Sequence, residues 1–333
     1  MKKIGYLGTG SWGFCLACLL GRKGYDVTSW TTNQELADTL NATGVHPRFP
    51  DVVAPKTIRF TTDIAEAVQD KELLVESVTT AGLRPVLEQV KAVTPLRVPL
   101  VLTSKGVELG SGMLLHDVVM EVFGKESKEL IGALSGPSFA AEIIRGLPSS
   151  VVASAFNREV IDQIVDAFTT NTLRVYPNSD IQGVTLVGAL KNPIAIACGI
   201  AEALNMGFSA RAALMTRGLH EIKKLGVALG CRPETFSGLA GMGDLCMTSS
   251  SSLSRNFRFG ALIGKGKSFK DAEEEIGMVV EGAYCAEAAL KLSEETGVPL
   301  PIIEGVHHIL HNKLQLSQVL EEIMKRSVKE EHL

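Results

Sequence analysis

Residues 2–30 read KKIGYLGTGSWGFCLACLLGRKGYDVTSW and place Gly8, Gly10 and Gly13 in the spacing GxGxxG. A β-rich segment precedes these glycines, and a helix-length segment and a second β-rich segment follow them. In this context the glycines permit a tight turn, let the backbone approach a pyrophosphate and let the helix pack closely on the strand. The pattern predicts a βαβ unit in which the helix N-terminus offers amide groups and a positive dipole end to phosphates.

The same stretch also imitates a secretory leader, because two lysines precede apolar residues that continue to Leu20. Four glycines, at positions 5, 8, 10 and 13, favour a turn instead, and the stretch is too short and too rich in glycine to span a membrane. A GxGxxG motif alone is weak evidence, but between two β-rich segments it favours dinucleotide binding.

The end of the second β-rich segment bears on the choice of cofactor. An acid at this point binds the adenine ribose in NAD-selective proteins, but here the sequence reads Trp30, Thr31, Thr32 and Asn33. No Asp or Glu repels a 2′-phosphate, and the hydroxyl groups of Thr31 and Thr32 are suited to bind one. Since no arginine stands there to favour the phosphate strongly, we expect NADPH or NADH and leave the preference open.

Length and composition are those of an ordinary globular chain. With 333 residues, of which 45% are hydrophobic and 21% are charged, two domains are expected. The net charge of -4 with interspersed signs gives no electrostatic footprint for nucleic acid or an anionic membrane. Six cysteines in a chain of this size indicate no disulfide framework, so we expect a cytoplasmic protein.

Two short motifs have the spacing of redox or metal sites. Cys15 and Cys18 form a CxxC without a second pair, so we expect them to supply two small buried faces of a helix. His307 and His311 lie one helical turn apart, but no third ligand is evident nearby. We therefore predict no metal site.

Alternating β-rich and helical segments fill the first part of the chain. The predicted strands are KKIGYLG, DVTSW, IRFTT, ELLVESV, PLVLTS, ELIGALSG, SVVAS and LRVYP. The predicted helices between them cover residues 14–23, 83–93, 113–123, 138–145 and 158–168. Strands joined by crossover helices imply an α/β fold with a doubly wound, mainly parallel, Rossmann-like sheet.

From about residue 180 the strand signals fade, and helices are predicted over residues 180–204, 209–229, 255–264, 271–276, 282–296 and 315–328. We therefore predict a dinucleotide-binding domain over residues 1–184 and an all-α substrate and catalytic domain over residues 185–333. A cleft between these domains is the expected site of chemistry.

One apolar segment, LVGALKNPIAIACGI at residues 186–200, contains a lysine. Most lysines in such segments lay their stem along apolar neighbours and reach water with the head group. The alternative for Lys191 is chemical, because reduction of a ketone needs a hydride from a nicotinamide and a proton from a side chain. An ammonium protonates the developing alkoxide, and the neutral amine accepts the proton in reverse. We predict Lys191 as the catalytic residue.

Three further segments are LVLTSKGVE with Lys105, SGPSFAAEIIRGLPSSVV with Gly136, Ser138 and Ala140, and GLAGMGDLCMTSSSSLSRNFRFG with Asp244, Thr248, Ser254, Arg255 and Asn256. Together with GTGSWG, GALKN and VVEG, in this order, they closely resemble the NAD(P)-dependent glycerol-3-phosphate dehydrogenase family from residue 4 to about residue 312. The resemblance implies interconversion of dihydroxyacetone phosphate and sn-glycerol 3-phosphate, which feeds glycerophospholipid synthesis.

The resemblance also implies which residues form the site. The substrate-binding residues would be Lys105, Gly136, Ser138, Lys191, Asp244, Ser254, Arg255 and Asn256. The cofactor-binding residues would be Gly8, Gly10, Ser11, Trp12, Gly13, Lys105, Ala140, Arg255, Val279 and Glu281. Asn192 and Thr248 would join the polar network around the reacting carbonyl. The expected partner is a small phosphorylated molecule, with no nucleic acid and no stable membrane insertion, and a homodimer stays open.

The triplet at residues 254–256 also has a local physical interpretation. A serine before RNFRFGALIG predicts a helix N-cap at Ser254, which places Arg255 and Asn256 in a first turn whose amides point outward. Such a turn suits a phosphate monoester, to which arginine adds a planar pair of charge-assisted donors. An exposed surface charge is the commoner role of an arginine.

Two segments depart from the family pattern. VESVTTAGLRPVL, residues 75–87, carries Glu76, Thr79 and Thr80 where the family has a more apolar strand that ends in Pro-Ser. HPRFPDV, residues 46–52, is one residue shorter than the usual segment. Both adjoin the cofactor side, so they affect the predicted cofactor preference more than the predicted chemistry.

Two other functions stay open at this point. A related two-domain dehydrogenase acting on a 3-hydroxyacid would share the glycine turn and the lysine, but it would not require Ser254, Arg255 and Asn256. A non-catalytic dinucleotide sensor would have little use for Lys191 together with Asp244.

Overall fold

The computed structural model describes residues 2–311, 314–325, 327 and 330–331. The chain forms two compact units, of which the first is Met1–Glu108 with Leu114–Thr185 and the second is Leu109–Met113 with Leu186–Leu333. The short segment 109–113 clusters with the second unit, which the sequence pattern did not predict. The assignment of residues 1–184 and 185–333 as separate functional domains stays a prediction.

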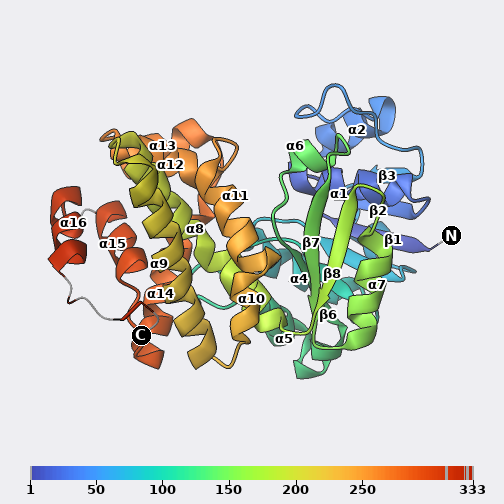
Figure 1. The fold of residues 1–333 in the computed structure, drawn as a ribbon. Helices are drawn as coiled ribbons and strands as arrows, with labels where there is room; N and C mark the ends of the chain where they lie inside the picture. The colour runs from blue at the N-terminus through green and yellow to red at the C-terminus, as the bar shows by residue number, and fades with distance from the viewer. Residues whose placement is uncertain (1, 312–313, 326, 328–329, 332–333) are drawn as a thin grey trace. The chain divides into compact units, whose positions relative to one another are not determined.

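The first unit contains an eight-stranded sheet in the order β3-β2-β1-β4-β5-β6-β7-β8 (Figure 1). The strands are β1 Lys3–Leu7, β2 Asp26–Trp30, β3 Ile58–Thr61, β4 Leu73–Glu76, β5 Leu100–Leu102, β6 Ile131–Ser135, β7 Ser149–Ala155 and β8 Leu173–Asn178. Neighbouring strands are parallel except β6 and β7. The strand order reverses between β1 and β4, as in doubly wound sheets. The predicted fold class is confirmed.

Helices connect these strands, and the sheet is therefore buried on its faces. They are α1 Ser11–Arg22, α2 Gln34–Thr43, α3 Ile64–Val68, α4 Thr80–Val93, α5 Leu115–Phe123, a 3₁₀ helix at Lys125–Leu130, α6 Ala140–Ile143 and α7 Arg158–Phe168. α1 contacts α6 and α7, whereas α4 contacts α3 and α5, so the helices form two groups. Strands covered on both faces consist of consecutive apolar residues, which explains why β5 contains only apolar side chains.

The core of the first unit forms around α1. Phe14 of this helix is fully buried together with Tyr6 of β1 and Phe168 of α7. Cys15 and Cys18 are buried in the same helix, and burial raises the pKa of Cys18 to about 12. The CxxC motif therefore supplies two packed faces of a core helix, as predicted.

The sequence pattern did not predict α2, because its residues QELADTLNAT lack a continuous apolar face. Ala37 and Leu40 are its buried side chains. The helix is instead stabilised at its ends. Asn33 Oδ1 accepts a hydrogen bond from the Leu36 N–H at 2.9 Å, and Gly44 ends the helix with a φ of 70°.

The second unit is built from helices. They are α8 Ile181–Ala203, which begins in the first unit, α9 Gly207–Ala228, α10 Pro233–Ser237, a π-helix at Leu239–Gly243, α11 Asp244–Ser250, α12 Arg255–Gly264, α13 Phe269–Ile276, α14 Glu281–Thr296, α15 Pro301–Leu310 and α16 Leu316–Lys325. The helix predicted over residues 315–328 corresponds to α16, and residues 326 and 328 lie outside the described residues.

α8 is a core helix that is apolar almost throughout. By length and composition it could cross a membrane, but 94% of its most apolar window is buried inside the protein. α12 packs against part of α8, and the backbones of the two helices approach each other closely. A Cβ on Gly199 of α8 would lie 2.0 Å from the Phe257 carbonyl oxygen, and one on Gly260 of α12 would lie 2.1 Å from the Ile196 carbonyl oxygen. The backbones of the two helices are therefore in direct contact.

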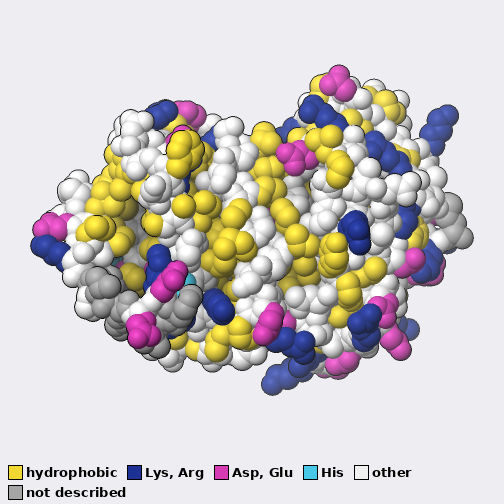
Figure 2. All heavy atoms as spheres, in the orientation of Figure 1, with side chains coloured by type: hydrophobic (Ala, Val, Ile, Leu, Met, Phe, Trp, Pro, Cys, Tyr) yellow, Lys and Arg dark blue, Asp and Glu magenta, His cyan; other side chains and the backbone are white. Residues whose placement is uncertain are grey.

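Charged side chains are distributed over the surface of both units. On the face shown in Figure 2, Lys and Arg side chains are interspersed with Asp and Glu side chains, and neither sign gathers into one field. This distribution agrees with the small net charge of -4.

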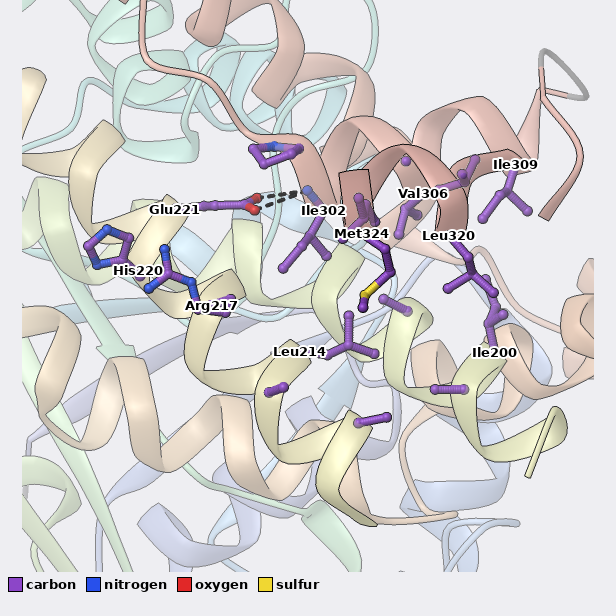
Figure 3. Close-up of a pocket in the computed structure, with 18 of the residues that line it drawn as sticks. Ile200, Leu214, Arg217, His220, Glu221, Ile302, Val306, Ile309, Leu320 and Met324 are labelled. Atoms are coloured by element: carbon purple, nitrogen blue, oxygen red, sulfur yellow. Dashed lines mark hydrogen bonds between the residues drawn. The ribbon is translucent and has the colours of Figure 1, made fainter. Parts of the chain in front are cut away.

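The second unit also contains a cavity of about 670 Å³ between α8, α9, α15 and α16 (Figure 3). Its walls are mostly apolar, and Leu214 and Met324 are among the side chains that point into it. At one end the Glu221 carboxylate accepts hydrogen bonds from the Ile302 N–H at 3.0 and 3.1 Å, so it occupies the N-terminus of α15. None of the predicted site residues is among the described residues that line this cavity.

Candidate active site

The glycine turn lies between β1 and α1, as the sequence predicted. Gly8 has a φ of 101°, and a Cβ there would lie 2.8 Å from the Ser77 carbonyl oxygen. At Gly13 a Cβ would lie 1.9 Å from the Gly8 carbonyl oxygen, because the first turn of α1 packs directly on the loop. Both positions therefore exclude a side chain for reasons internal to the fold.

Gly10 is different from the other two glycines, because a Cβ at this residue would meet nothing within 4 Å. Gly10 is the N-cap of α1, no side chain caps the helix, and its first turn carries no acid. Ser11 and Trp12 begin the helix and are partly exposed. The first-turn amides thus face open space beside a backbone without side chains, which fits the pyrophosphate of a dinucleotide.

The two threonines that follow β2 differ in their exposure to solvent. Thr31 is buried, and its Oγ1 accepts a hydrogen bond from the Asn33 N–H at 3.2 Å. Asn33 in turn caps α2. Thr32 is exposed, so of the two predicted threonines it has the more accessible hydroxyl group for a ribose or a 2′-phosphate.

A second cluster of predicted residues joins the loops after β5 and β6. The Lys105 ammonium donates to the Gly136 carbonyl oxygen at 2.9 Å, and the Ser138 hydroxyl donates to the same oxygen at 3.0 Å. Gly136 has a φ of 133°, and a Cβ there would approach Val151 Cα to 3.0 Å. Ala140 is the first residue of α6, one turn further along. The structure thus brings together Lys105, Gly136 and Ser138.

Lys191 lies on α8 and is only 4% exposed. Its Nζ lies 2.7 Å from Asp244 Oδ1 and donates to Thr248 Oγ1 at 2.6 Å. The Thr248 hydroxyl donates to Asp244 Oδ1 at 3.3 Å, which closes a triangle of three buried polar groups. Lys191 therefore does not reach bulk water along its apolar neighbours, which was the commoner alternative.

Local helix geometry brings Asp244 and Thr248 to Lys191. The two residues are four positions apart on α11, so they lie on the same face. α11 follows the π-helix at Leu239–Gly243, in which a Cβ on Gly241 would lie 2.0 Å from the Phe236 carbonyl oxygen. This close contact fixes the register at which α11 begins.

The predicted N-cap at Ser254 is confirmed, because Ser254 Oγ accepts a hydrogen bond from the Phe257 N–H at 3.3 Å. Ser254 is buried, whereas Arg255 and Asn256 are half-buried in the first turn of α12. No acid stands in this turn. The first turn of α12 therefore has the positive character that suits an anion.

The start of α12 is held against the start of α14. Asn256 Oδ1 accepts a hydrogen bond from the Gly282 N–H at 3.1 Å, and Arg255 Nη1 donates to the Val279 carbonyl oxygen at 3.5 Å. Glu281 is the first residue of α14. The structure thus brings Arg255 and Asn256 beside Val279 and Glu281, which come from a segment more than twenty residues away.

The predicted residues fall into two groups, each within one unit. The first unit holds Gly8, Gly10, Ser11, Trp12, Gly13, Lys105, Gly136, Ser138 and Ala140. The second unit holds Lys191, Asn192, Asp244, Thr248, Ser254, Arg255, Asn256, Val279 and Glu281. Their roles toward substrate and cofactor stay predictions.

Sequence reasoning missed a buried polar network in the first unit. Glu76 at the end of β4 is fully buried and accepts hydrogen bonds from the loop after β5. Burial raises the pKa of Glu76 to about 7, against the lowering effect of hydrogen bonds from Ser104, Val78 and Thr103. The available signal was the change from apolar to polar residues at the ends of two strands, LLVES and LVLTS.

The chain matches two family models of known proteins. The NAD-dependent glycerol-3-phosphate dehydrogenase N-terminus matches residues 3–161, and the C-terminus of the same family matches residues 180–321. The chain belongs to this family. The resemblance inferred from the sequence motifs is therefore confirmed.

Individual relatives of this glycerol-3-phosphate dehydrogenase family are similar over the full length. Glycerol-3-phosphate dehydrogenase (NAD(P)+) of Protochlamydia amoebophila is 54% identical over 333 residues, covering 100% of both chains. The protein of the same name from Chlamydia caviae is 49% identical over 332 residues, covering 100% of this chain and 99% of the other. The crystal structure of glycerol-3-phosphate dehydrogenase from Coxiella burnetii has a TM-score of 0.91 at 34% identity, covering 98% of this chain and 99% of that chain.

A solved structure of lower identity shares only the fold with this chain. The structure of D-mandelate dehydrogenase with NADH and anilino(oxo)acetate has a TM-score of 0.66 at 14% identity, covering 96% of this chain. The evidence that this chain belongs to the family is therefore the two family-model matches and the similar relatives, and not the fold alone.

Proposed function

We propose that this chain is an NAD(P)-dependent glycerol-3-phosphate dehydrogenase that interconverts dihydroxyacetone phosphate and sn-glycerol 3-phosphate. The two matched family models and the similar relatives are all named as glycerol-3-phosphate dehydrogenases. The structural observation that carries the proposal is Lys191, a charged side chain held by Asp244 and Thr248 inside an apolar helical unit.

Lys191 is the proton donor and acceptor of the proposed reaction. The bound nicotinamide supplies the hydride. The Lys191 ammonium protonates the alkoxide oxygen that develops on the ketone, and in reverse the neutral amine accepts the alcohol proton. Asp244 and Thr248 accept hydrogen bonds from two of the three N–H groups of the ammonium, and this fixes the direction of the head group. Such fixed polar groups stabilise developing charge without reorganisation.

The phosphate of the substrate is proposed to bind at the first turn of α12. Ser254 shapes this turn as its N-cap, Arg255 contributes a guanidinium and Asn256 contributes an amide donor. Lys105, Gly136 and Ser138 are proposed to contact the same substrate from the loops after β5 and β6. Asn192 belongs to the polar surroundings of Lys191.

The glycine turn is proposed to hold the pyrophosphate of the cofactor. Gly10, Ser11 and Trp12 offer the open first turn of α1, whereas Gly8 and Gly13 make that turn sterically feasible. The further cofactor contacts are proposed to be Lys105, Ala140, Arg255, Val279 and Glu281. Thr32 offers a hydroxyl group without a repelling acid, so we expect both NADPH and NADH to serve.

We further propose that the enzyme acts in the cytoplasm on a small phosphorylated substrate, supplies glycerol 3-phosphate for glycerophospholipid synthesis and assembles as a homodimer. Size-exclusion chromatography with light scattering tests the dimer.

The central test is NADPH oxidation with dihydroxyacetone phosphate by the wild type, Lys191→Ala and Lys265→Ala. Losing a positioned acid or base costs about 10² to 10⁴ in turnover, so Lys191→Ala is expected to lose that much. Cofactor binding should persist, because the glycine turn is untouched. Lys265→Ala removes an exposed lysine and should behave as the wild type. Normal turnover by Lys191→Ala would refute the assigned role, and cofactor binding by the wild type without any turnover would refute the function.

A further inference from the structure

Glu76 connects two loops at the carboxyl end of the sheet in the first unit. It is the last residue of β4 and is fully buried. Its Oε2 accepts a hydrogen bond from the Val78 N–H at 3.1 Å, in the loop after β4. Its Oε1 accepts from the N–H groups of Thr103 at 3.0 Å and Ser104 at 3.1 Å, in the loop after β5. One carboxyl group therefore serves three backbone donors from two loops.

The loop after β5 is the one that carries Lys105, the residue that follows Ser104. The Lys105 ammonium donates to the Gly136 carbonyl oxygen at 2.9 Å. Because the backbone of Thr103 and Ser104 is anchored on Glu76, the point from which Lys105 extends is anchored on Glu76 as well. The carboxyl group thus acts on Lys105 through the backbone, without touching its side chain in the contacts described.

A second layer of hydroxyl groups ties the same loops to β1. The Tyr6 hydroxyl lies 2.7 Å from Ser77 Oγ, which lies 2.5 Å from Thr103 Oγ1. Thr103 Oγ1 donates to the Glu76 carbonyl oxygen at 2.6 Å. The ends of β1, β4 and β5 are therefore joined by one continuous hydrogen-bond network.

The hydroxyl of Ser104 lies within hydrogen-bonding distance of two acceptors in this network. Ser104 Oγ lies 2.9 Å from Glu76 Oε2 and 2.5 Å from the Val78 carbonyl oxygen. A hydroxyl has one hydrogen to donate. If Glu76 is ionised, Ser104 reaches two acceptors and satisfies only one of them. If Glu76 carries a proton on Oε2, it donates to Ser104, and Ser104 donates to Val78, so both contacts become hydrogen bonds.

Among the titratable groups around Glu76, we expect only Glu76 itself to gain or lose a proton near neutral pH. Tyr6 faces it from β1, and burial raises the pKa of this phenol far above the neutral range, so it stays protonated. Cys15 of α1 faces Tyr6 and is likewise kept protonated, because burial raises the pKa of its thiol. Lys105, from the loop after β5, is directed to Gly136. Within the described part of the chain, no basic side chain is paired with the Glu76 carboxyl group.

We propose that Glu76 is a positioning residue whose protonation completes the hydrogen-bond chain from Glu76 through Ser104 to Val78 and thereby fixes the loop that carries Lys105. The inference rests on the proposed function, in which Lys105 contacts the substrate. Burial raises the pKa of Glu76 to about 7, so the proton is lost as the pH rises through neutrality. The Michaelis constant for dihydroxyacetone phosphate should increase over that range because Lys105 is held less firmly.

The test compares the wild type with Glu76→Gln and Ser104→Ala in steady-state kinetics between about pH 6 and about pH 8.5. Glutamine does not titrate, and its amide nitrogen in the place of Oε2 can donate to Ser104, but it gives up the hydrogen bond that Oε2 accepts from the Val78 N–H. Other groups titrate in all variants, so the informative quantity is the ratio of kcat/KM between wild type and variant. One neutral hydrogen bond is worth about threefold to tenfold, so the ratio of wild type to Glu76→Gln should fall by that factor toward high pH. The change should lie mainly in KM for the ketone, because Lys105 is the substrate contact carried by this loop.

Ser104→Ala removes the hydroxyl through which the proton acts but keeps the backbone N–H. Its kcat/KM should lack the Glu76-dependent step, so it provides the test if Glu76→Gln does not fold. Infrared difference spectra give a readout without activity: the wild type minus Glu76→Gln should show a protonated carboxyl band at about pH 6 that disappears by about pH 8.5. A ratio that is constant with pH for both variants, or the absence of that band, would overturn the proposal. An inactive wild type would instead refute the proposed function and leave the spectroscopic result intact.

Discussion

Lys191 and Asp244 form a buried ion pair, and such a pair is weak evidence for a role in stability. Both side chains are almost completely buried, so the free energy of removing two charges from water opposes their mutual attraction. Similar buried pairs are often replaced by apolar residues without loss of stability. A pair in this position, inside an apolar helix, is therefore better explained by chemistry than by folding.

This argument predicts the result of a double substitution. Asp244→Leu should lower the free energy of unfolding by about 3 to 5 kcal/mol, because it leaves the Lys191 ammonium buried without its counter-charge. Adding Lys191→Met should restore most of that loss, while turnover stays at least about 10² to 10⁴ below that of the wild type. Urea unfolding followed by circular dichroism measures both effects. Additive losses in the double variant would contradict this account.

Arg255 and Arg258 provide a matched pair on one helix. Both lie on α12, but Arg255 is half-buried in the first turn and Arg258 is exposed. Arg255→Ala should raise KM for dihydroxyacetone phosphate by about tenfold or more, as expected for losing a charge-assisted hydrogen bond worth about 1.5–3 kcal/mol. Arg258→Ala makes the same change in net charge and should leave KM unaltered. If both substitutions raised KM equally, the cause would be the loss of one positive charge, and Arg255 would not be a specific phosphate contact.

At the scale of elements, the loop between β1 and α1 separates two kinds of glycine. Gly13 has no room for a side chain because the helix packs on the Gly8 carbonyl, whereas Gly10 faces open space. The first kind of glycine serves folding, and the second leaves room for a ligand.

Alanine substitutions should therefore have different effects at the two positions, one on stability and the other on cofactor binding. Gly13→Ala should destabilise the first unit, because its Cβ would lie 1.9 Å from backbone. Gly10→Ala should fold normally but bind NADPH more weakly, because its Cβ would occupy the space proposed for the pyrophosphate. Quenching of Trp12 and Trp30 fluorescence reports binding, and thermal unfolding reports stability. Tight NADPH binding by a stable Gly10→Ala protein would contradict the proposed cofactor position.

At the scale of the whole molecule, Glu76 is expected to make the stability of the first unit depend on pH. Glu76 lies in the first unit, and both tryptophans of the chain, Trp12 and Trp30, also lie there. Burial raises the pKa of Glu76 from 4.5 in the unfolded chain to about 7 in the folded one. The folded state therefore binds a proton more tightly, and this contribution is fully present below about pH 4.5 and is lost as the pH rises through about 7.

The expected size of this effect is measurable. A shift from 4.5 to about 7 corresponds to roughly 3 kcal/mol between the two ends of that range. The stability of the wild type relative to Glu76→Gln should therefore decrease by up to this amount as the pH is raised from about 4.5 to about 7.5. Urea unfolding followed by tryptophan fluorescence isolates the first unit. A relative stability that rises with pH would mean that Glu76 is ionised in the folded state.

Features with a local cause were predictable from the sequence. The glycine turn, the cap at Ser254 and the alternation of strands and helices depend on residues a few positions apart. The helix α2 escaped prediction because its stability comes from its two ends and from only two buried side chains. The family resemblance identified Lys191 and Asp244 as site residues, but their pairing joins positions more than fifty residues apart.

The sequence by itself determined the local geometry, the fold class and the family, since these follow from periodic patterns and from motifs with fixed internal spacing. Only the tertiary structure decided that Lys191 meets Asp244 and Thr248, and that Glu76 is buried between two loops and holds a proton near neutrality. The physical reason is that burial and long-range packing set the environment of a charge. Neither can be read from the neighbouring residues along the chain.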